Sequence, residues 1–214
     1  MPVKAFPNPR NSDEDGLLAV GGDLSPETLI LAYRQGIFPW PIEGLPLPWF
    51  CPPQRAILDF DDLHIPRSLH RSWNKKPYQI TLDAAFQSVI QQCAATRQKE
   101  TWITSQMEEA YVRLHQMGLA HSAEAWIGDR LVGGVYGVSV EGTFAGESMF
   151  HLEDDASKHA LLHLVEHLRG RGLGWIDIQQ LTPHMERLGA KLIPRDDYLD
   201  RLKRTQALKL RLFE

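Results

Sequence analysis

The stretch Gly142-Thr143-Phe144-Ala145-Gly146-Glu147-Ser148-Met149-Phe150 has the small, apolar and aromatic residues of a buried β-strand, yet it carries a carboxylate at its centre. A second stretch of this kind, Trp175-Ile176-Asp177-Ile178-Gln179, contains another acid. Strand side chains alternate between faces, so Trp175, Asp177 and Gln179 are predicted to share one face. An unpaired buried charge is costly. The two acids therefore belong either to a satisfied pair in the core or to a functional site.

The sequence on either side of these stretches predicts a mixed α+β fold. Residues 121–150 have strand character, with Gly128-Asp129 and Glu141-Gly142 as tight turns, which indicates an antiparallel meander of three strands. A helix that starts at Asp154 or Asp155 and ends at Gly170 carries one apolar stripe and is expected to pack on that sheet. A strand, a short helix and a last strand are then expected over 175–179, 182–189 and 190–193.

Upstream, three more helices are predicted by their caps and apolar spacing. Ser25-Pro26-Glu27 is typical of a helix start and Gly36 of its end. A second helix carries apolar residues at helical spacing over 86–93, and a third lies between Thr104 and Gly118. Residues 38–53, rich in proline and aromatic residues, are expected to form an ordered, irregular loop. This loop leads into the boundary between a small N-terminal domain (1–54) and a larger domain (55–214).

Composition narrows the function classes. The chain has 214 residues, of which 43% are hydrophobic and 23% charged, as in compact globular domains. No apolar run approaches the roughly 20 residues of a membrane helix, and the N-terminus lacks a secretion signal, so we expect a cytoplasmic protein without a membrane partner. Cys51 and Cys93 have no ligand-like spacing and are expected to be free thiols.

Positive charge is concentrated in two stretches, although the net charge of −4 argues against indiscriminate binding to nucleic acid. Residues 64–76 carry Arg67, Arg71, Lys75 and Lys76 without an acid, and residues 201–211 carry five unopposed cations. Either stretch could contact phosphates, or could be an ordinary solvated face. The sequence leaves both interpretations open.

Short motifs in a fixed order carry a resemblance. They are Gly36-Ile37-Phe38-Pro39-Trp40, Thr101-Trp102-Ile103-Thr104, Gly133-Gly134-Val135-Tyr136-Gly137, Gly146-Glu147-Ser148-Met149-Phe150 with Ala156-Ser157-Lys158, Asp177-Ile178-Gln179 and Leu188-Gly189-Ala190. Over about residues 16–202 the chain resembles the leucyl/phenylalanyl-tRNA–protein transferases, bacterial enzymes that add Leu or Phe to proteins beginning with Lys or Arg. The resemblance implies an acetyltransferase-like (GNAT-like) α+β fold and a product marked for degradation by the N-degron pathway.

The resemblance also implies roles for individual residues. Asp177 would orient or polarise Gln179, whose amide contacts the incoming amine, and Glu147 would help to place the aminoacyl group or the acceptor. The implied substrate-binding residues are Trp40 and Trp102 beside the adenosine and ester, Val135, Phe144 and Leu164 around the side chain of the donor amino acid, and Ser157. The best-known relatives have Met and Phe in place of Val135 and Leu164, which leaves the ranking of Leu, Phe and Met as donors open.

The implied partners are aminoacyl-tRNA, held at its acceptor stem through Arg67, Arg71, Lys75 and Lys76, and proteins with an N-terminal Lys or Arg. The enzyme is expected to act as a monomer with no metal and no small cofactor.

Two motifs and two other functions are alternatives to a tRNA-dependent transferase. The glycine-rich run 169–174 matches the phosphate-binding loop that an acyl-CoA N-acyltransferase requires. It follows a helix instead of opening one, so the run is better explained as the end of that helix, and the acyl-CoA N-acyltransferase is the less favoured enzyme. His159, His163 and His167 lack an accompanying carboxylate or cysteine pattern, which favours an exposed polar face over a metal site. A non-catalytic module that binds basic N-termini or RNA ends is the third reading, with Glu147 and Asp177 serving recognition alone.

Overall fold

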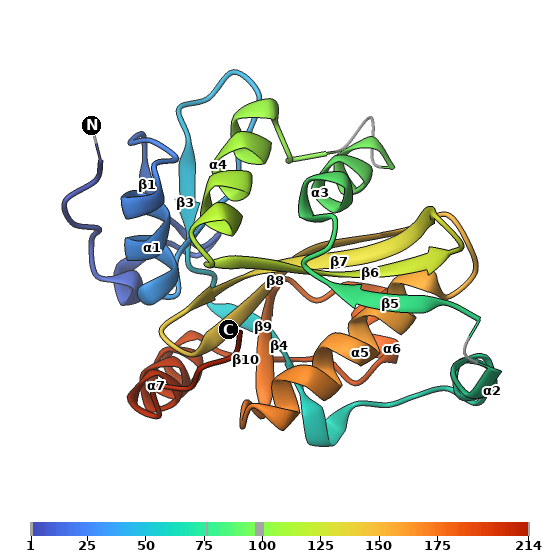
Figure 1. Ribbon diagram of the computed structural model, residues 1–214. Coiled ribbons are helices and arrows are strands. Elements are labelled where there is room, and N and C mark those ends of the chain that lie inside the picture. Colours follow the sequence, from blue (N-terminus) through green and yellow to red (C-terminus); the bar gives the residue numbers. More distant parts are fainter. Residues whose placement is uncertain (1, 76, 97–100, 214) are drawn as a thin grey trace.

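The computed structural model describes residues 2–75, 77–96 and 101–213, and is built around a seven-stranded sheet with helices on both faces (Figure 1). All neighbouring strands are antiparallel except β8 and β9, which run parallel. The predicted α+β class with a mostly antiparallel sheet is therefore confirmed. Across the sheet the strands are β10 (Lys191–Pro194), β4 (Gln54–Asp59), β9 (Trp175–Gln179), β8 (Thr143–His151), β7 (Arg130–Val140), β6 (Ala120–Ile127) and β5 (Gln79–Leu82).

The helices form a layer on each side of this sheet. α3 and α4 cover one face and α5 covers the opposite face, with α6 beside it (Figure 1). α7 packs near β10 and β4. In chain order the helices are α1 (Pro26–Arg34), α2 (Arg67–Lys75), α3 (Phe86–Ala95), α4 (Ser105–Gln116), α5 (Ala156–Gly170), α6 (Pro183–Arg187) and α7 (Arg195–Ala207), with 3-10 turns at Pro9–Asn11 and Phe60–Asp62.

The predicted helix starts and meander turns are confirmed. The side chains of Ser25, Thr104 and Thr182 accept hydrogen bonds from backbone N–H groups in the first turns of α1, α4 and α6. The turns at 128–129 and 141–142 join β6 to β7 and β7 to β8. Cys51 and Cys93 do not form a disulfide, as expected, and both are buried.

The N-terminal region differs from its prediction. Residues 38–53 were expected to be an irregular loop, but β2 (Phe38–Pro39) and β3 (Pro48–Phe50) lie within them and form a small sheet with β1 (Leu17–Val20), in the order β1-β3-β2. Proline is tolerated here because Pro48 begins its strand and Pro39 lies on an edge strand. Of the aromatic residues of this stretch, Phe38 and Trp49 are buried, and Trp40 and Phe50 are half-buried.

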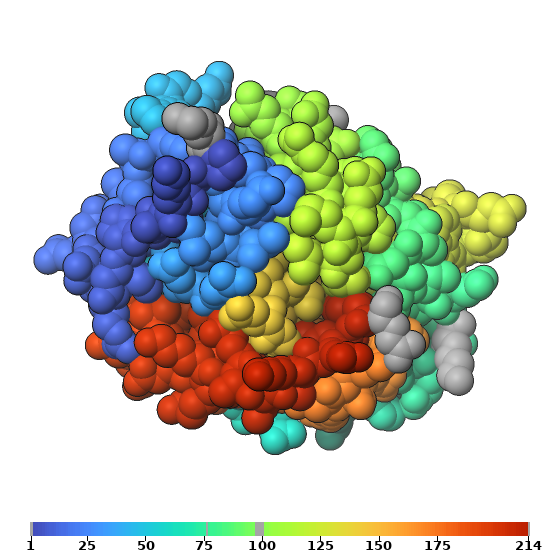
Figure 2. All heavy atoms as spheres, turned by 60° about the vertical axis from the view of Figure 1, so that its left-hand side comes forward, coloured from blue at the N-terminus to red at the C-terminus, as the bar shows by residue number. Residues whose placement is uncertain are grey.

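Two apolar clusters lie on either side of the sheet. One joins α3 and α4 to residues of the N-terminal region, including Leu29, Ile37 and Trp49. The other lies beneath α5. On one face of the molecule the N-terminal segment, α4 and the C-terminal segment meet (Figure 2). Arg10 of the N-terminal segment forms ion pairs with Asp196 and Asp200 of α7. The N-terminal region is thus in contact with both the sheet layer and α7.

Candidate active site

The candidate site lies where β8 and β9 separate. These parallel strands share one aligned pair, Ala145 with Asp177. The pairing of β7 with β8 is irregular at the same point, since Gly137 lies opposite Gly146 and Tyr136 opposite Ser148, which leaves Glu147 as an extra, bulged residue. Bulges of this kind re-aim a side chain. The local strand geometry thus opens a space between β8 and β9 and directs Glu147 toward it.

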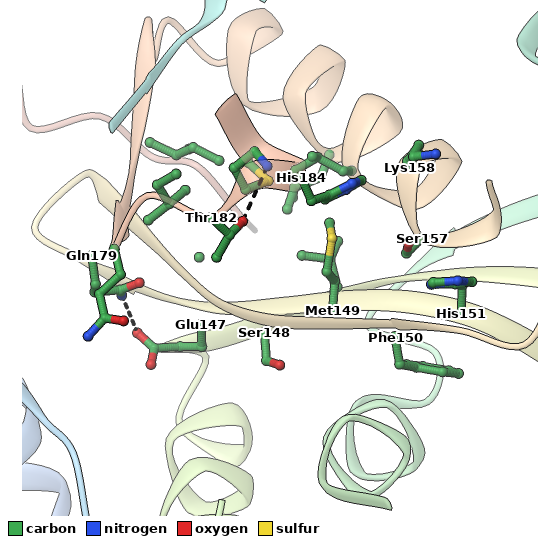
Figure 3. Close-up of a pocket in the computed structure, with 18 of the residues that line it drawn as sticks. Glu147, Ser148, Met149, Phe150, His151, Ser157, Lys158, Gln179, Thr182 and His184 are labelled. Carbon is green, nitrogen blue, oxygen red and sulfur yellow. Dashed lines mark hydrogen bonds between the residues drawn. The ribbon is translucent and has the colours of Figure 1, made fainter. Parts of the chain in front are cut away.

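A cavity of about 690 Å³ fills this space (Figure 3). Its walls come from β7, β8, β9, α5 and α6, and they are mostly apolar. Val135, Phe144 and Leu164, the three residues assigned to a side-chain pocket, all line it. Other apolar lining residues are Met149, Leu161, Ile176, Ile178 and Met185. A mostly apolar cavity with a few polar groups is typical of a small-molecule site.

Two tryptophans also line the cavity. The rings of Trp40 and Trp102 are stacked, with centroids 5.2 Å apart and an angle of 25° between their planes. Trp102 is buried and Trp40 is half-buried. They come from segments 62 residues apart in the chain, and together they present a flat aromatic surface to the cavity.

Glu147 and Gln179 form the polar group of the cavity. The Gln179 side-chain nitrogen donates to Oε1 of Glu147 at 2.9 Å, and the Tyr111 hydroxyl donates to Oε2 at 3.3 Å (Figure 3 shows the first bond). Tyr111 is itself hydrogen-bonded to Tyr33, and both tyrosines are buried. Burial and the nearby negative charge of Asp177 raise the pKa of Glu147 to about 8, although the bonds from Tyr33 and Tyr111 oppose this.

Asp177 is a neighbour of Gln179 but its carboxylate is held elsewhere. Oδ1 accepts from Nε of Arg55 at 2.8 Å and Oδ2 accepts from Nη2 at 2.6 Å. The Tyr198 hydroxyl donates to Oδ2 at 2.9 Å. Asp177 is buried and does not line the large cavity, whereas Gln179 does. Of the predicted acid and amide, only the amide is available to a molecule in the cavity.

One link nevertheless joins the two residues. The backbone N–H of Gln179 donates to Oδ1 of Asp177 at 2.9 Å. Gln179 has a φ of 55°, in the left-handed region that residues other than glycine rarely adopt. Backbone strain of this kind clusters at functional sites. The carboxylate of Asp177 therefore holds the backbone of Gln179 in the conformation that presents its amide to Glu147.

The far end of the cavity contains polar residues that the sequence analysis did not assign. Ser157, which was assigned, is buried in the first turn of α5. Lys158 follows it and pairs with Asp155, and His184 lies in α6 (Figure 3). Burial and the charge of Lys158 lower the pKa of His184. Because Lys158 directly follows Ser157, the sequence could have indicated that Lys158 also lies near the cavity. The position of His184 depends on how α6 packs, which the sequence does not indicate.

The basic stretches occupy surface positions. Arg67, Arg71 and Lys75 are exposed at intervals of four residues along α2, so they share one helical face. Lys76 lies outside the described residues. None of these three lines the cavity. In the C-terminal stretch, Arg201 is already paired with Asp59.

The histidine prediction was wrong in part. His159 is buried and packs against Trp73 and Tyr78, so these histidines do not form an exposed face. His167 instead hydrogen-bonds to the carbonyl of Leu212. Within 2–75, 77–96 and 101–213, no group of three or more histidine, cysteine or acidic residues could hold a metal ion.

The glycine-rich run lies at a helix end, as predicted. The glycine-rich run 169–174 is the C-terminal end of α5 and the turn after it, with Gly172 at a φ of 90°. Among the helices that the structure describes, none combines the length and the apolar character needed to span a bilayer.

Comparison with known proteins gives consistent results across the chain. The family model for the leucyl/phenylalanyl-tRNA protein transferase matches residues 57–203, and the model for the N-terminal domain of that family matches residues 22–53. A leucyl/phenylalanyl-tRNA–protein transferase of Anaeromyxobacter dehalogenans (strain 2CP-C) is 51% identical over 203 residues, covering 94% of this chain and 87% of the relative. The transferase of Shigella dysenteriae serotype 1 is 49% identical and covers 96% of this chain and 89% of the relative.

Solved structures show only a slight likeness. The C-terminal domain of a putative lysylphosphatidylglycerol synthetase from Agrobacterium fabrum aligns with a TM-score of 0.43 and 11% identity, over 86% of this chain and 61% of that one. A TM-score this low does not establish a common fold, so the acetyltransferase-like topology stays a prediction. The sequence matches, in contrast, cover nearly the whole chain at about half identity. The chain belongs to the leucyl/phenylalanyl-tRNA–protein transferase family.

Proposed function

We propose that this chain transfers Leu or Phe, with Met as a further candidate donor, from aminoacyl-tRNA to the N-terminal Lys or Arg of acceptor proteins, which marks them for degradation by the N-degron pathway. One observation carries the proposal: a single cavity brings together a stacked tryptophan pair, an apolar pocket and the Glu147–Gln179 pair. These three features match the three groups that must meet, namely the adenosine, the donor side chain and the acceptor amine.

The reaction is the aminolysis of an ester. The α-amino nitrogen forms a bond to the ester carbonyl carbon, the bond from that carbon to the ribose oxygen breaks, and the proton lost by nitrogen is balanced by the one that the ribose oxygen gains. An α-amine has a pKa of about 7.7 to 8.0 and needs little help to become nucleophilic. The site must chiefly hold the amine against the carbonyl.

Gln179 and Glu147 are placed to do this. The nitrogen of the Gln179 amide is used in its bond to Glu147, so the amide oxygen can accept a hydrogen bond from the incoming amine. Glu147 supplies a carboxyl group beside the acceptor, whose first side chain is a cation; that cation favours the ionised form of a group whose pKa is raised to about 8 in its absence. Asp177 acts on the reaction through the backbone of Gln179 and does not itself contact the amine.

The donor occupies the rest of the cavity. The ring pair of Trp40 and Trp102 offers a stacking surface for the terminal adenosine, a contact that contributes about 1–3 kcal/mol per base. Val135, Phe144 and Leu164 surround the side chain of the aminoacyl group, and Ser157 lies at the polar end. Arg67, Arg71 and Lys75 on α2, together with Lys76, contact the phosphates of the acceptor stem.

Further parts of the proposal concern the whole chain. The fold is acetyltransferase-like, a proposal supported by the parallel β8 and β9 that separate after one aligned pair. The chain divides into domains at 1–54 and 55–214, and the two family models meet near that boundary. It works as a monomer in the cytoplasm, where charged tRNA is found.

Incubation with radiolabelled Phe-tRNA and a peptide that begins with Arg tests the proposal. We expect label in the peptide, and a loss of most of the rate in Gln179→Ala and Asp177→Ala. Gln206→Ala is the control, because Gln206 is a surface residue of α7 bonded to the carbonyl of Arg34. Absence of transfer by the wild-type chain, with intact binding of the peptide or the tRNA, would establish the non-catalytic module instead. Undiminished transfer in both variants would remove the two residues from the mechanism.

A further inference from the structure

Arg55 is the most completely enclosed cation in the described part of the chain. Its side chain is 1% exposed, and its guanidinium lies between the rings of Phe38 and Tyr198, 4.6 and 4.5 Å from their centroids. Two of its nitrogens bind the two oxygens of Asp177. Arg55 does not line the cavity. Any effect it has on a bound molecule therefore passes through other residues.

Resting on the proposed function, we propose that Arg55 is a positioning residue, whose guanidinium fixes Asp177 and, through Asp177, the reactive conformation of Gln179. Gln179 keeps its left-handed backbone only while something holds it, since such a conformation is strained for a residue with a side chain. The bond from its N–H to Asp177 Oδ1 is that hold. Asp177 in turn is fixed by the two-pronged contact with Arg55.

A second set of contacts extends from the same guanidinium. Phe38, which covers one of its faces, begins β2, and Trp40 follows β2 directly. The N–H of Trp40 donates to the carbonyl of Pro48 at 3.1 Å, so the paired strands β2 and β3 together fix the position of this tryptophan at the cavity. Arg55 thus contacts both the segment that carries the donor-side tryptophan and the residue that holds the acceptor-side amide.

Only arginine can make this set of contacts. Its planar fork binds both oxygens of a carboxylate at once and stacks on aromatic rings, whereas lysine offers a single point of charge. Burial opposes the charge of Arg55, but Asp177 raises its pKa above the ordinary value, so the cation persists. Arg55→Lys therefore keeps the charge while it removes the orientation of Asp177.

The test compares Arg55→Lys with Arg201→Lys. Arg201 is a matched control because it also binds a carboxylate, that of Asp59, and lies 4.8 Å from the ring of Trp175, yet it has no bond to Asp177. For each variant kcat and the two KM values are measured per folded molecule, with the folded fraction taken from urea unfolding. We expect kcat to fall about 100-fold in Arg55→Lys, because a small misplacement has an effect of this size, with KM for Phe-tRNA within threefold of wild type. Arg201→Lys should keep kcat within about threefold.

A second readout does not depend on activity. The side-chain NH₂ resonances of Gln179 can be assigned in ¹H–¹⁵N spectra by their absence from Gln179→Ala. In Arg55→Lys they should move toward the positions of a solvent-exposed glutamine, while those of Gln206 stay in place. If the wild-type chain transfers nothing, the proposed function fails, and these spectra still decide whether Arg55 orders Gln179.

Two results would overturn the role of Arg55: unmoved Gln179 resonances, or equal losses of kcat in both lysine variants. Should Arg55→Lys not fold, Tyr198→Phe takes its place. It keeps the ring over Arg55 and removes only the hydroxyl that donates to Asp177. A smaller fall in kcat and a smaller shift of the Gln179 resonances are then expected, and the absence of both contradicts the proposal.

Discussion

The side-chain nitrogen of Gln179 lies 2.9 Å from Oε1 of Glu147, so the end of β9 and the bulge of β8 are joined inside the cavity. Both residues have unusual backbones for strand residues, since Glu147 is the bulged residue and Gln179 is left-handed. A regular pair of strands would point neither side chain in this direction. The hydrogen bond is thus a product of two local irregularities that meet, and under the proposed function it marks the place where the acceptor amine is held.

The raised pKa of Glu147 predicts a stability effect that depends on pH. Glu147 binds its proton more tightly in the folded protein, where its pKa is about 8, than in the unfolded chain, where it is near 4.5. Its contribution to the free energy of unfolding is therefore lost as pH rises between these values, by about 1 kcal/mol per pH unit. Glu147→Gln lacks this titration. Urea unfolding of both proteins at several pH values should show that the free energy of unfolding of the variant increases relative to that of the wild type as pH rises. A difference in free energy that does not change with pH would contradict the raised pKa.

The bond from Tyr111 predicts the direction of a second pKa change. Its hydroxyl donates to Glu147 and lowers the pKa of that carboxyl against the larger effect of burial. Tyr111→Phe should therefore raise the pKa of Glu147 further, and the acidic limb of the pH–rate profile should move to higher pH. Tyr78→Phe is the control, since the hydroxyl of Tyr78 donates to the backbone carbonyl of Asp154 and not to Glu147. Equal profiles for wild type and Tyr111→Phe would show that the bond has no effect on the charge of Glu147.

Local signals predicted the parts of the fold that depend on neighbours in sequence. Capping side chains at Ser25, Thr104 and Thr182 and turn residues at 128–129 and 141–142 gave the helices and the meander. The strand β4 was not predicted, because its partners β9 and β10 follow more than 100 residues later. β1, β5, α2 and α7 were also missed, and the run of charged residues in α7 hides its short buried stripe.

The site shows the same division between local and distant information. Family motifs pointed to eight residues that line the cavity, yet regular alternation along 175–179 suggested that Asp177 and Gln179 act side by side. The structure separates their tasks, because the partner of Asp177 is Arg55, 122 positions away. No spacing in the sequence indicates that pair. The bulge at Glu147 could not be predicted from the sequence either, since it depends on the register between β7 and β8.

The size of the side-chain pocket predicts the choice of donor. Leu164 is buried in the cavity wall, and Leu164→Phe adds volume there. The smaller space should disfavour Phe relative to Leu by about tenfold in kcat/KM, the scale of a small change of size in an apolar pocket. Leu162→Phe is the matched control, because Leu162 lies in the same helix and is buried without lining the cavity. Competition between Leu-tRNA and Phe-tRNA measures the ratio, and an unchanged ratio in Leu164→Phe would place the donor side chain elsewhere.

The exposed face of α2 predicts how salt affects the reaction. Arg67, Arg71 and Lys75 have no ion-pair partner among the described residues, so each is free to neutralise a phosphate. Replacing all three by Ala should weaken binding of Phe-tRNA and reduce the slope of log Kd against log salt by about 2 to 3, since each phosphate contact contributes somewhat less than one unit.

The control for α2 replaces Lys203, Arg204 and Lys209, three exposed cations at the C-terminal end of the chain. It removes the same amount of charge, so it separates a specific phosphate contact from the general field of the protein, which long-range screening would affect equally. Equal reductions in the salt slope for both triple variants would mean that α2 has no special role. A larger reduction in the C-terminal variant would place the tRNA-facing surface at the end of α7 and the residues after it, since these cations would then be the ones that release counterions on binding.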